Sequence, residues 1–369
     1  MSVSPLKPFD TLHSDILIIG AGVAGLSSAL EFASRGARVT ILERGHAGAE
    51  STWAGAGILS PLLPWDYSDD VNALSEYSRS LFPRWCEDLL ARSGLDPEYR
   101  RSGMMVMPMF DEEAARAWCD GHGWHCEDRR SGDFLDADTG ERGLWFRDVA
   151  QVRNPRLIKA LRASLEGMGV SLHEGIQIAD ISYDSGRVNK VCTNRGDFSA
   201  HSYVVAAGAW TGELPGLEAF RARIFPVRGQ MLLFKLPPEA LTIIVYRDGH
   251  YLIPRADGHV LVGSTLEYVG FEKATTEHAR KELLRFAVEM FPLLGQTELV
   301  YQWSGLRPGS PRNIPVIGSH QEFENLFINS GHFRYGVTMA PGSAKLLASQ
   351  IFGESPAIPV APYAASRVL

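Results

Sequence analysis

The stretch Asp15–Arg44, DILIIGAGVAGLSSALEFASRGARVTILER, decides the fold. Its apolar run at 16–19 predicts a buried strand. Gly20, Gly22 and Gly25 follow at G-x-G-x-x-G spacing. The first glycine permits a tight turn, the second lets the backbone approach a pyrophosphate, and the third allows close packing of helix on strand. The stretch therefore predicts a strand–turn–helix unit that binds a dinucleotide.

A second apolar strand is predicted at 38–42, after a segment with helical spacing, and it ends on Glu43. An acidic residue there accepts hydrogen bonds from a ribose 2′-hydroxyl, which favours NAD or FAD over a 2′-phosphorylated cofactor. A signal peptide or a membrane helix is the alternative for so apolar a segment. Asp10 and Asp15 replace the basic flank of a signal peptide, and Glu31 interrupts the run, so both alternatives are disfavoured.

Composition sets the broad class. The 369 residues leave room for about two domains, and 45% of them are apolar, enough for a large core. The formal net charge of -7, with no basic run, argues against a nucleic-acid partner. The four cysteines form no C-x-x-C pair, which fits a reducing compartment, and no second long apolar segment indicates a membrane anchor. We expect a soluble cytoplasmic enzyme.

Two other patterns bear on ligands. Small side chains dominate residues 51–58, which would let backbone amides reach a flat ligand ring; a plain flexible loop is the alternative. Cys119, His122, His125 and Cys126 lie close together in sequence, but a zinc site normally draws on two separated ligand pairs, and no second pair exists. We interpret this cluster as a solvated helix end and turn, and predict no metal site.

Periodicity and turn residues predict the remaining elements. Helices are expected at 69–93, 154–168 and 275–291, strands at 104–109, 170–178, 188–193, 202–207 and 326–329, a hairpin at 251–263, and a loop at 305–309. The strand at 202–207 ends in small residues and Gly208, which is expected to bind the cofactor by pressing its backbone against the nucleotide. The nucleotide domain is therefore expected to resume there after an excursion. A helix that opens at Pro341 would offer free N–H groups to an anionic reduced flavin.

Seven segments resemble the glycine oxidase branch of the D-amino acid oxidase family, which are FAD-dependent amine oxidases. The segments are DILIIGAGVAGLSSAL, STWAGAGILSPL, VVAAGAWTG, PVRGQMLLF, YLIPRADGHVLVGST, WSGLRPGSPRNIPVIG and GHFRYGVTMAPGSAKLL. With the patterns above, the resemblance implies a mixed α/β fold: a Rossmann-type FAD-binding domain and a second, largely antiparallel substrate domain. We expect the first to comprise residues 14–85, 147–215 and 305–369, and the second 86–146 and 216–304.

The resemblance implies a set of residues that hold FAD. The pyrophosphate would be lined by Gly20, Gly22, Val23, Ala24 and Gly25, the adenosine ribose by Glu43 and Arg44, and the adenine by Ile178. The diphosphate and the isoalloxazine would be approached by Ser51, Thr52, Ala56, Gly57 and Ile58. The far edge of the flavin would be wrapped by His332, Phe333, Arg334, Tyr335, Gly336, Val337 and Thr338. Related sarcosine oxidases carry a covalent flavin link in the stretch that matches 307–318, and this chain has no cysteine there. Non-covalent FAD is therefore expected.

For the substrate, Arg307 matches the arginine that grips the carboxylate, and a planar guanidinium suits that group because it pairs in a bidentate manner. Tyr251 matches a tyrosine that supports the carboxylate, Arg334 a second polar contact at the same place, and Tyr246 a lid aromatic. Taken singly, Arg307 could equally be a surface ion-pair residue and Tyr251 a core aromatic. Tyr335 departs from the family pattern, where asparagine is usual, and leaves the substrate's size open.

The activity implied by this resemblance is oxidative deamination of glycine, sarcosine, other N-alkyl glycines or small D-amino acids. Hydride transfer to the flavin would give an imino acid without a side-chain base, and reoxidation by oxygen would give hydrogen peroxide. The resemblance further implies supply of an imine for thiamine thiazole synthesis, and a homo-oligomer. The alternatives are a D-amino acid dehydrogenase that uses a quinone, an RNA-modifying amine oxidase, and a non-catalytic nucleotide-binding regulator.

Overall fold

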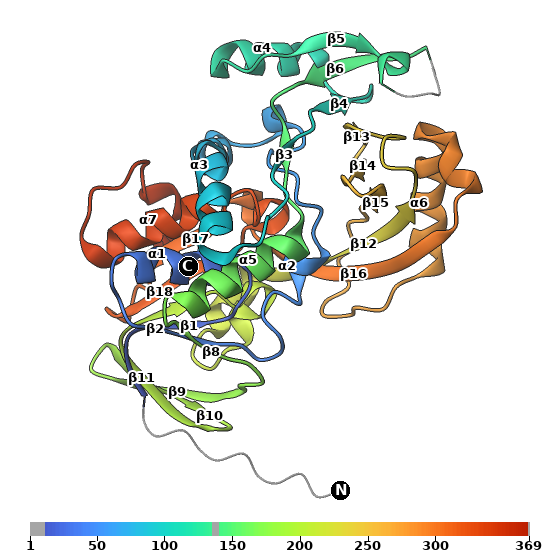
Figure 1. Cartoon of the computed structure of the whole chain (residues 1–369). Helices are drawn as coiled ribbons and strands as arrows, with labels where there is room; N and C mark the ends of the chain where they lie inside the picture. The colour runs from blue at the N-terminus through green and yellow to red at the C-terminus, as the bar shows by residue number, and fades with distance from the viewer. Residues whose placement is uncertain (1–11, 135–139, 368–369) are drawn as a thin grey trace, which may run out of the picture.

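The computed structural model describes residues 12–134 and 140–367. A mixed sheet forms the centre of one half of the molecule (Figure 1). In spatial order its strands are β17 (Val316–Ser319), β18 (Leu326–Ser330), β11 (Gly196–Val205), β1 (Leu12–Ile19), β2 (Val39–Leu42) and β8 (Ser171–His173). The strands from β18 to β8 run parallel, and β17 is antiparallel. The hairpin of β9 (Ile178–Asp184) and β10 (Arg187–Thr193) extends from β11.

The two faces of β1 contact different layers because successive residues of a strand point to opposite sides. Ile16 and Ile18 face a core that is shared with helices, whereas Leu17 and Ile19 face a core shared with the β9–β10 hairpin. The helices of the first core are α1 (Val23–Ser34), α3 (Asp69–Ser93), α5 (Asn154–Gly167) and α7 (Ala340–Phe352). The predicted buried strand at 16–19 is therefore central to both cores.

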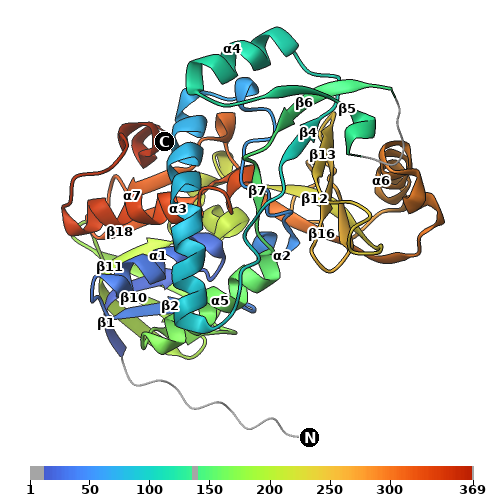
Figure 2. The same ribbon diagram turned by 45° about the horizontal axis from the view of Figure 1, so that its top comes forward.

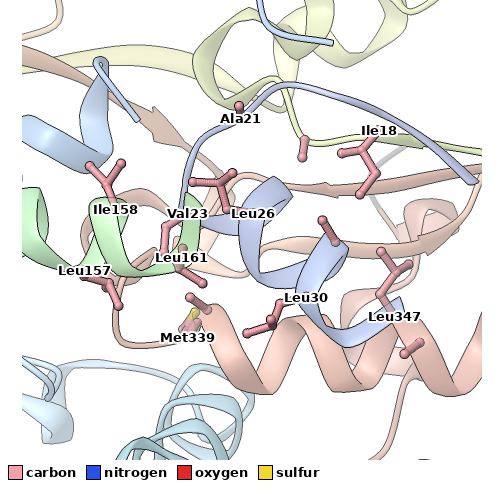
Figure 3. Close-up of a cluster of buried hydrophobic side chains, with 14 of the residues drawn as sticks. Ile18, Ala21, Val23, Leu26, Leu30, Leu157, Ile158, Leu161, Met339 and Leu347 are labelled. Carbon is pink, nitrogen blue, oxygen red and sulfur yellow. The ribbon is translucent and has the colours of Figure 1, made fainter. Parts of the chain in front are cut away.

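Helix α1 is held between two neighbouring helices. Figure 3 shows Val23, Leu26 and Leu30 of α1 between Leu161 of α5 and Leu347 of α7. Helix α3 runs along α5 and α7 (Figure 2). This packing fixes the start of α1, which points at the site described below.

A second sheet forms the other half of the molecule. In spatial order its strands are β16 (Leu299–Gly309), β12 (Phe225–Lys235), β15 (His259–Gly263), β14 (His250–Pro254), β13 (Ile244–Arg247), β4 (Met104–Val106), β6 (Arg142–Phe146) and β5 (Glu127–Arg130). All the pairings are antiparallel except that of β13 with β4. Helix α6 (Glu277–Met290) packs its buried Leu283, Phe286 and Met290 on one face. The predicted mixed α/β fold with a largely antiparallel second sheet is confirmed.

Shorter elements lie outside the two large sheets. They are α2 (Ser51–Ala54), α4 (Glu112–His122) and the two-stranded pair of β3 (Arg100–Arg101) and β7 (Ala150–Gln151). Two of the expected domain boundaries fall inside elements: residue 85 lies within α3, and residue 305 lies within β16. The division of the chain into domains stays a prediction.

Three sequence-based elements differ from the structure. Residues 305–309 were expected as a loop, but they complete β16, because Gly305 pairs with Gly229 of β12 and Gly309 with Phe225. The expected strand at 170–178 is only β8, and Ile178 begins β9. The expected strand at 104–109 ends at Val106, since Met109 has φ 104° and a side chain that is 69% exposed.

Candidate functional site

The start of α1 forms a glycine cradle. Gly20 has φ +106°, and a Cβ there would overlap the carbonyl oxygen of Ala206. A Cβ on Gly25 would overlap the carbonyl oxygen of Gly20. Glycine is therefore required at both positions, the first for a tight turn against β11 and the second for close packing of α1 on β1. Both roles are the ones that the spacing predicts.

Side chains hold the loops around this cradle. The Val23 backbone N–H donates to Thr52 Oγ1 at 2.9 Å. The carboxylate of Glu43 accepts from the backbone N–H of Ala21 at 2.8 Å and from that of Gly45 at 2.7 Å. Glu43 is thus fixed at the end of β2 by two charge-assisted hydrogen bonds, and it lines the neighbouring cavity.

This neighbouring hollow, which we call the nucleotide cavity, has about 1160 Å³ of empty space, including the part open to solvent. It is lined by Gly20, Glu43, Arg44 and Ile178 of the predicted FAD set. Sequence reasoning missed Trp210, which also lines it and carries the Arg44 guanidinium 4.5 Å above its ring. A cation over a ring at this distance is a favourable contact.

A second hollow, the reaction cavity, has about 1110 Å³ of empty space, again with an open part. The two cavities adjoin, because both are lined by Gly22, Ser51, Thr52, Ala206 and Gly208. Most of the predicted FAD-binding residues line this one: Gly22, Val23, Ala24, Ser51, Thr52, Ala56, Gly57, Ile58, Gly208, His332, Phe333, Arg334, Tyr335, Gly336 and Val337. The paired hollows match the two-part shape of a dinucleotide.

Two predicted FAD residues do not line either cavity. Gly25 is used for packing, as described above, and the Thr338 hydroxyl is buried and donates to the carbonyl oxygen of Ile58 at 2.9 Å. The expectation of free N–H groups at the start of α7 is wrong. The Gly342 N–H donates to Ser78 Oγ at 3.0 Å and the Ser343 N–H to the carbonyl oxygen of Met339 at 2.8 Å, so the helix start is satisfied by protein.

Arg307, on β16, also lines the reaction cavity. Its Nη2 donates to Ser264 Oγ at 2.6 Å and its Nη1 to the carbonyl oxygen of Thr265 at 3.2 Å. Burial is the main cause that lowers the pKa of the guanidinium, with Arg334 adding repulsion. Arginine nevertheless stays charged at any working pH. Ser264 was not identified from sequence, since a serine after a strand gives no signal of this role.

The second sheet supplies the rest of the wall around Arg307. Tyr251 of β14 lines the cavity, and its hydroxyl donates to Met231 Sδ at 3.5 Å. Gly229, Met231 and Ser264 line the cavity too, although only sheet pairing reveals them. Tyr246, the expected lid aromatic, is buried on β13 and lines neither cavity; its hydroxyl accepts from the Gly249 N–H at 3.0 Å.

The charge of the reaction cavity is one-sided. Among the lining residues within 12–134 and 140–367, Arg307 and Arg334 are charged and none is acidic. The nearby Glu267 is engaged elsewhere: its carboxylate pairs with Arg228, which is itself buried, and accepts from Gln230. A buried positive charge is stable only when an anion or hydrogen-bond acceptors compensate it. The cavity therefore suits an anionic ligand.

His332 is buried in the wall of this cavity, with 3% of its surface exposed. Burial lowers its pKa to about 4, so the ring is neutral at working pH. Its Nε2 has no hydrogen-bond partner among the described residues. An orphaned buried polar atom calls for a ligand partner. Together with the glycine cradle and the fixed Glu43, it shows that the residues present fit a flavin dinucleotide.

The cysteine–histidine cluster is divided among different partners. Cys119 is buried in α4, the ring of His122 stacks on Trp118 at 4.3 Å, and His125 Nε2 lies 3.1 Å from a carboxylate oxygen of Glu127. In 12–134 and 140–367 no group of three or more His, Cys, Asp or Glu residues could hold a metal ion. Across the same ranges, no helix is both long and apolar enough to cross a membrane.

The Rossmann-type sheet, its glycine cradle and the adjoining pair of cavities define a flavin-dependent oxidoreductase. Comparison with known proteins agrees. A glycine oxidase of Pseudomonas aeruginosa is 41% identical over 355 residues, 95% of this chain and 98% of that protein. The bifunctional protein ThiO/ThiG of Synechocystis sp. is 33% identical over 92% of this chain, which spans 52% of that longer protein.

The crystal structure of glycine oxidase from Geobacillus kaustophilus has a TM-score of 0.88 with this chain, at 28% identity, over 97% of this chain and 100% of that one. Residues 15–350 match the family of FAD dependent oxidoreductases that is named DAO. The chain belongs to this family, and FAD is its cofactor. The predicted family and cofactor, and the predicted class of an FAD-dependent amino acid oxidase, are confirmed.

Proposed function

We propose that the protein oxidises the amine of glycine, sarcosine, other N-alkyl glycines or small D-amino acids, with oxygen as the final acceptor. The observation that carries this proposal is Arg307. Its guanidinium is held by Ser264 and Thr265 in the wall of the reaction cavity, and none of the described residues that line this cavity is acidic. A preorganised guanidinium without a carboxylate is a receptor for the carboxylate of an amino acid.

The substrate is oriented by this anchor. Its carboxylate pairs with Arg307 beside the Tyr251 hydroxyl, so its α-carbon and nitrogen extend toward the residues proposed to hold FAD: Ala56, Gly57, Ile58 and His332. Holding the two reactants in one geometry removes the entropic cost of their encounter, which is a large part of the barrier. When bound, FAD supplies the acceptor for the hydride that leaves the α-carbon.

Proton transfer needs no side-chain base in this account. In the described part of the chain, no carboxylate or lysine lines the reaction cavity, and His332 is held neutral by burial in its wall. The positive field of Arg307 and Arg334 disfavours an ammonium group, so the amine reacts in its neutral form with a lone pair that forms the C=N bond. Water then hydrolyses the imine to an oxo acid and ammonia or an amine.

Several finer features belong to the same proposal. We propose that FAD is held without a covalent link, that Tyr251, Arg334 and the FAD-lining residues act as the resemblance implies, and that the chain folds as the two domains described above. A homo-oligomer in the cytoplasm that supplies an imine for thiamine thiazole synthesis is proposed from the resemblance alone. The likeness to glycine oxidases over nearly the whole chain supports oxygen over a quinone acceptor.

One experiment tests the acceptor and the substrate together. The purified yellow protein is mixed under air with glycine, sarcosine, D-alanine and D-proline, and peroxide release is followed. We expect peroxide from the small substrates, in proportion to the substrate consumed. Anaerobic bleaching of the flavin without peroxide under air would instead indicate a dehydrogenase, and no bleaching would reject amino acid oxidation.

A further inference from the structure

The guanidinium of Arg307 is held by a short segment that follows β15. Ser264 Oγ accepts from Arg307 Nη2 at 2.6 Å, and the carbonyl oxygen of Thr265 accepts from Nη1 at 3.2 Å. Ser264 and Thr265 are buried, but neither belongs to a helix or strand, so their place is not fixed by a ladder of backbone hydrogen bonds. The position of Arg307 therefore depends on what holds this segment against the sheet.

The Thr265 side chain is held between β12 and Glu267. Its hydroxyl accepts from the backbone N–H of Gln230, on β12, at 2.9 Å and donates to Glu267 Oε1 at 2.5 Å. The same carboxylate oxygen accepts from Gln230 Nε2 at 2.9 Å. Gln230 is fully buried, so a shift of Thr265 would leave polar groups unpaired in the interior, which is costly.

Glu267 is itself fixed by Arg228, which is also on β12. The two side chains form an ion pair, in which Arg228 Nε donates to Glu267 Oε2 at 3.2 Å, and the Arg228 side chain is only 6% exposed. Their backbones also pair, with N–H···O distances of 2.9 and 3.0 Å. Burial alone would raise the pKa of this carboxyl, but hydrogen bonds from Arg228, Thr265 and Gln230 lower it, so the group is charged.

We propose that Glu267 is a positioning residue for the oxidation: through Thr265 it holds the guanidinium of Arg307 where that group receives the carboxylate of the substrate. Glu267 itself lines neither cavity, so its effect passes through the protein. This inference rests on the proposed function and deepens it, because it assigns the groups that keep the carboxylate anchor in place.

Two other roles for Glu267 make different predictions for the binding of a carboxylate ligand. A carboxylate that acted only through its field would repel the ligand, so removing its charge would tighten binding. A carboxylate that served only the stability of the fold would leave binding unchanged in the folded protein. A positioning residue has the opposite effect to the first, because a displaced guanidinium makes a poorer bidentate pair and binding weakens.

The test measures the Kd of (methylthio)acetate on the FAD-loaded protein by isothermal titration calorimetry. This compound has the shape of sarcosine with sulfur in place of the amine, so it presents the carboxylate and cannot be oxidised by this route. Glu267→Gln keeps the size of the side chain but puts an N–H donor among groups that donate to it. We expect the Kd to rise by about tenfold or more at unaltered FAD content. An equal or lower Kd in Glu267→Gln would overturn the proposal.

Glu31→Gln is the matched control. The side chain of Glu31 is 17% exposed, against 23% for Glu267, and its carboxylate likewise pairs with cations, here Arg35 and Lys345. It lies on α1 and lines neither cavity. We expect the wild-type Kd in this variant, and a rise equal to that of Glu267→Gln would overturn the proposal, because loss of any partly buried ion pair would then have the same effect.

A second variant, Thr265→Val, keeps the test decisive if Glu267→Gln does not fold. Valine has the shape of threonine and leaves the ion pair of Glu267 with Arg228 in place, but it removes the hydroxyl that joins this carboxylate to the anchor. The Kd should again rise by about tenfold, and an unchanged Kd would reject the proposal. Turnover of glycine and sarcosine by the wild type with unchanged binding in the variants would refute this inference and leave the proposed function standing. Failure of the wild type to oxidise any small amino acid would refute the proposed function itself.

Discussion

The guanidinium of Arg307 lies directly over Gly229, so closely that a Cβ on Gly229 would overlap it. Gly229 is on β12 and Arg307 on the neighbouring β16, where Gly305 is the residue opposite Gly229. The guanidinium of Arg307, the carboxylate anchor, can therefore lie against the backbone of Gly229 only because this residue has no side chain. This relationship joins the antiparallel sheet to the chemistry of the site.

Gly229→Ala tests that relationship. The added methyl group must displace the end of the Arg307 side chain, and a misplaced anchor costs up to about a hundredfold in reaction rate. We expect kcat/KM for sarcosine to fall by about tenfold or more while the FAD content stays the same. Gly121→Ala in α4, where a Cβ meets nothing within 4 Å, is the matched control. Wild-type kinetics in Gly229→Ala would show that the position of the Arg307 guanidinium does not depend on the lack of a side chain at Gly229.

Glu43→Gln should weaken FAD binding. The carboxylate of Glu43 accepts from two backbone N–H groups and faces the nucleotide cavity, and a neutral amide replaces one of its acceptor oxygens by a donor. A charge-assisted hydrogen bond from the ribose of FAD to this carboxylate is worth about 1.5–3 kcal/mol, so its loss should raise the Kd for FAD by about tenfold or more. Fluorescence of released flavin on dilution measures the change, with exposed Glu239→Gln as the control. An unaltered Kd would show that Glu43 does not contribute to binding of the FAD ribose.

Arg255→Met should destabilise the fold near the flavin loop. Arg255 is buried, and its guanidinium donates to Gln151 Oε1 at 2.6 Å, to the carbonyl oxygen of Val152 at 3.0 Å and to that of Ala56 at 2.7 Å. Methionine leaves these buried acceptors unpaired, at a cost of about 2–4 kcal/mol in the free energy of unfolding. Denaturant unfolding measures it, with exposed Arg285→Met as the reference. If Arg255→Met lowers the free energy of unfolding no more than Arg285→Met does, water has replaced the guanidinium as the hydrogen-bond donor to these acceptors.

His332 should make stability depend on pH in a defined window. Its pKa falls from an ordinary 6.5 to about 4 in the folded protein because it is buried. Between pH 6.5 and about 4 the unfolded chain therefore binds a proton at His332, whereas the folded protein does not. The free energy of unfolding should fall by up to about 3 kcal/mol as the pH is lowered through this range.

Denaturant unfolding across that range measures the effect. His332→Gln should show a shallower decline than the wild type, and His278→Gln, a change at an exposed histidine, should follow the wild type. Parallel curves for His332→Gln and the wild type would mean that the folded protein protonates His332 as readily as the unfolded chain does.

Local patterns predicted much of the FAD side of the site. Glycine spacing and the acidic strand end depend on residues adjacent in sequence, and the structure places Gly20, Gly22 and Glu43 around one cavity. The helix predicted at 69–93 has those limits because Asp69 starts it and Gly94, with φ 69°, ends it. Arg307 was identified by resemblance, and it lies in the reaction cavity as expected.

Contacts between distant segments could not be predicted in this way. The glycines and proline at 305–309 have the composition of a loop, yet pairing with β12 makes them a strand. Ser264 and Gly229 acquire their roles only because β15 and β16 flank β12. Tyr246 was expected at the substrate, but its hydroxyl accepts the Gly249 N–H and it lies outside both cavities. Sequence order alone does not show which strands become neighbours.

The measurement that tests the central claim most directly is an anaerobic titration of the holoenzyme with glycine and sarcosine, followed by the bleaching of the flavin absorbance. Arg307→Met is measured beside the wild type at equal FAD content. We predict complete bleaching of the wild-type flavin and a half-saturating substrate concentration at least about tenfold higher in Arg307→Met. An oxidised flavin in the wild type at saturating substrate, or equal titration curves for the two proteins, would contradict it.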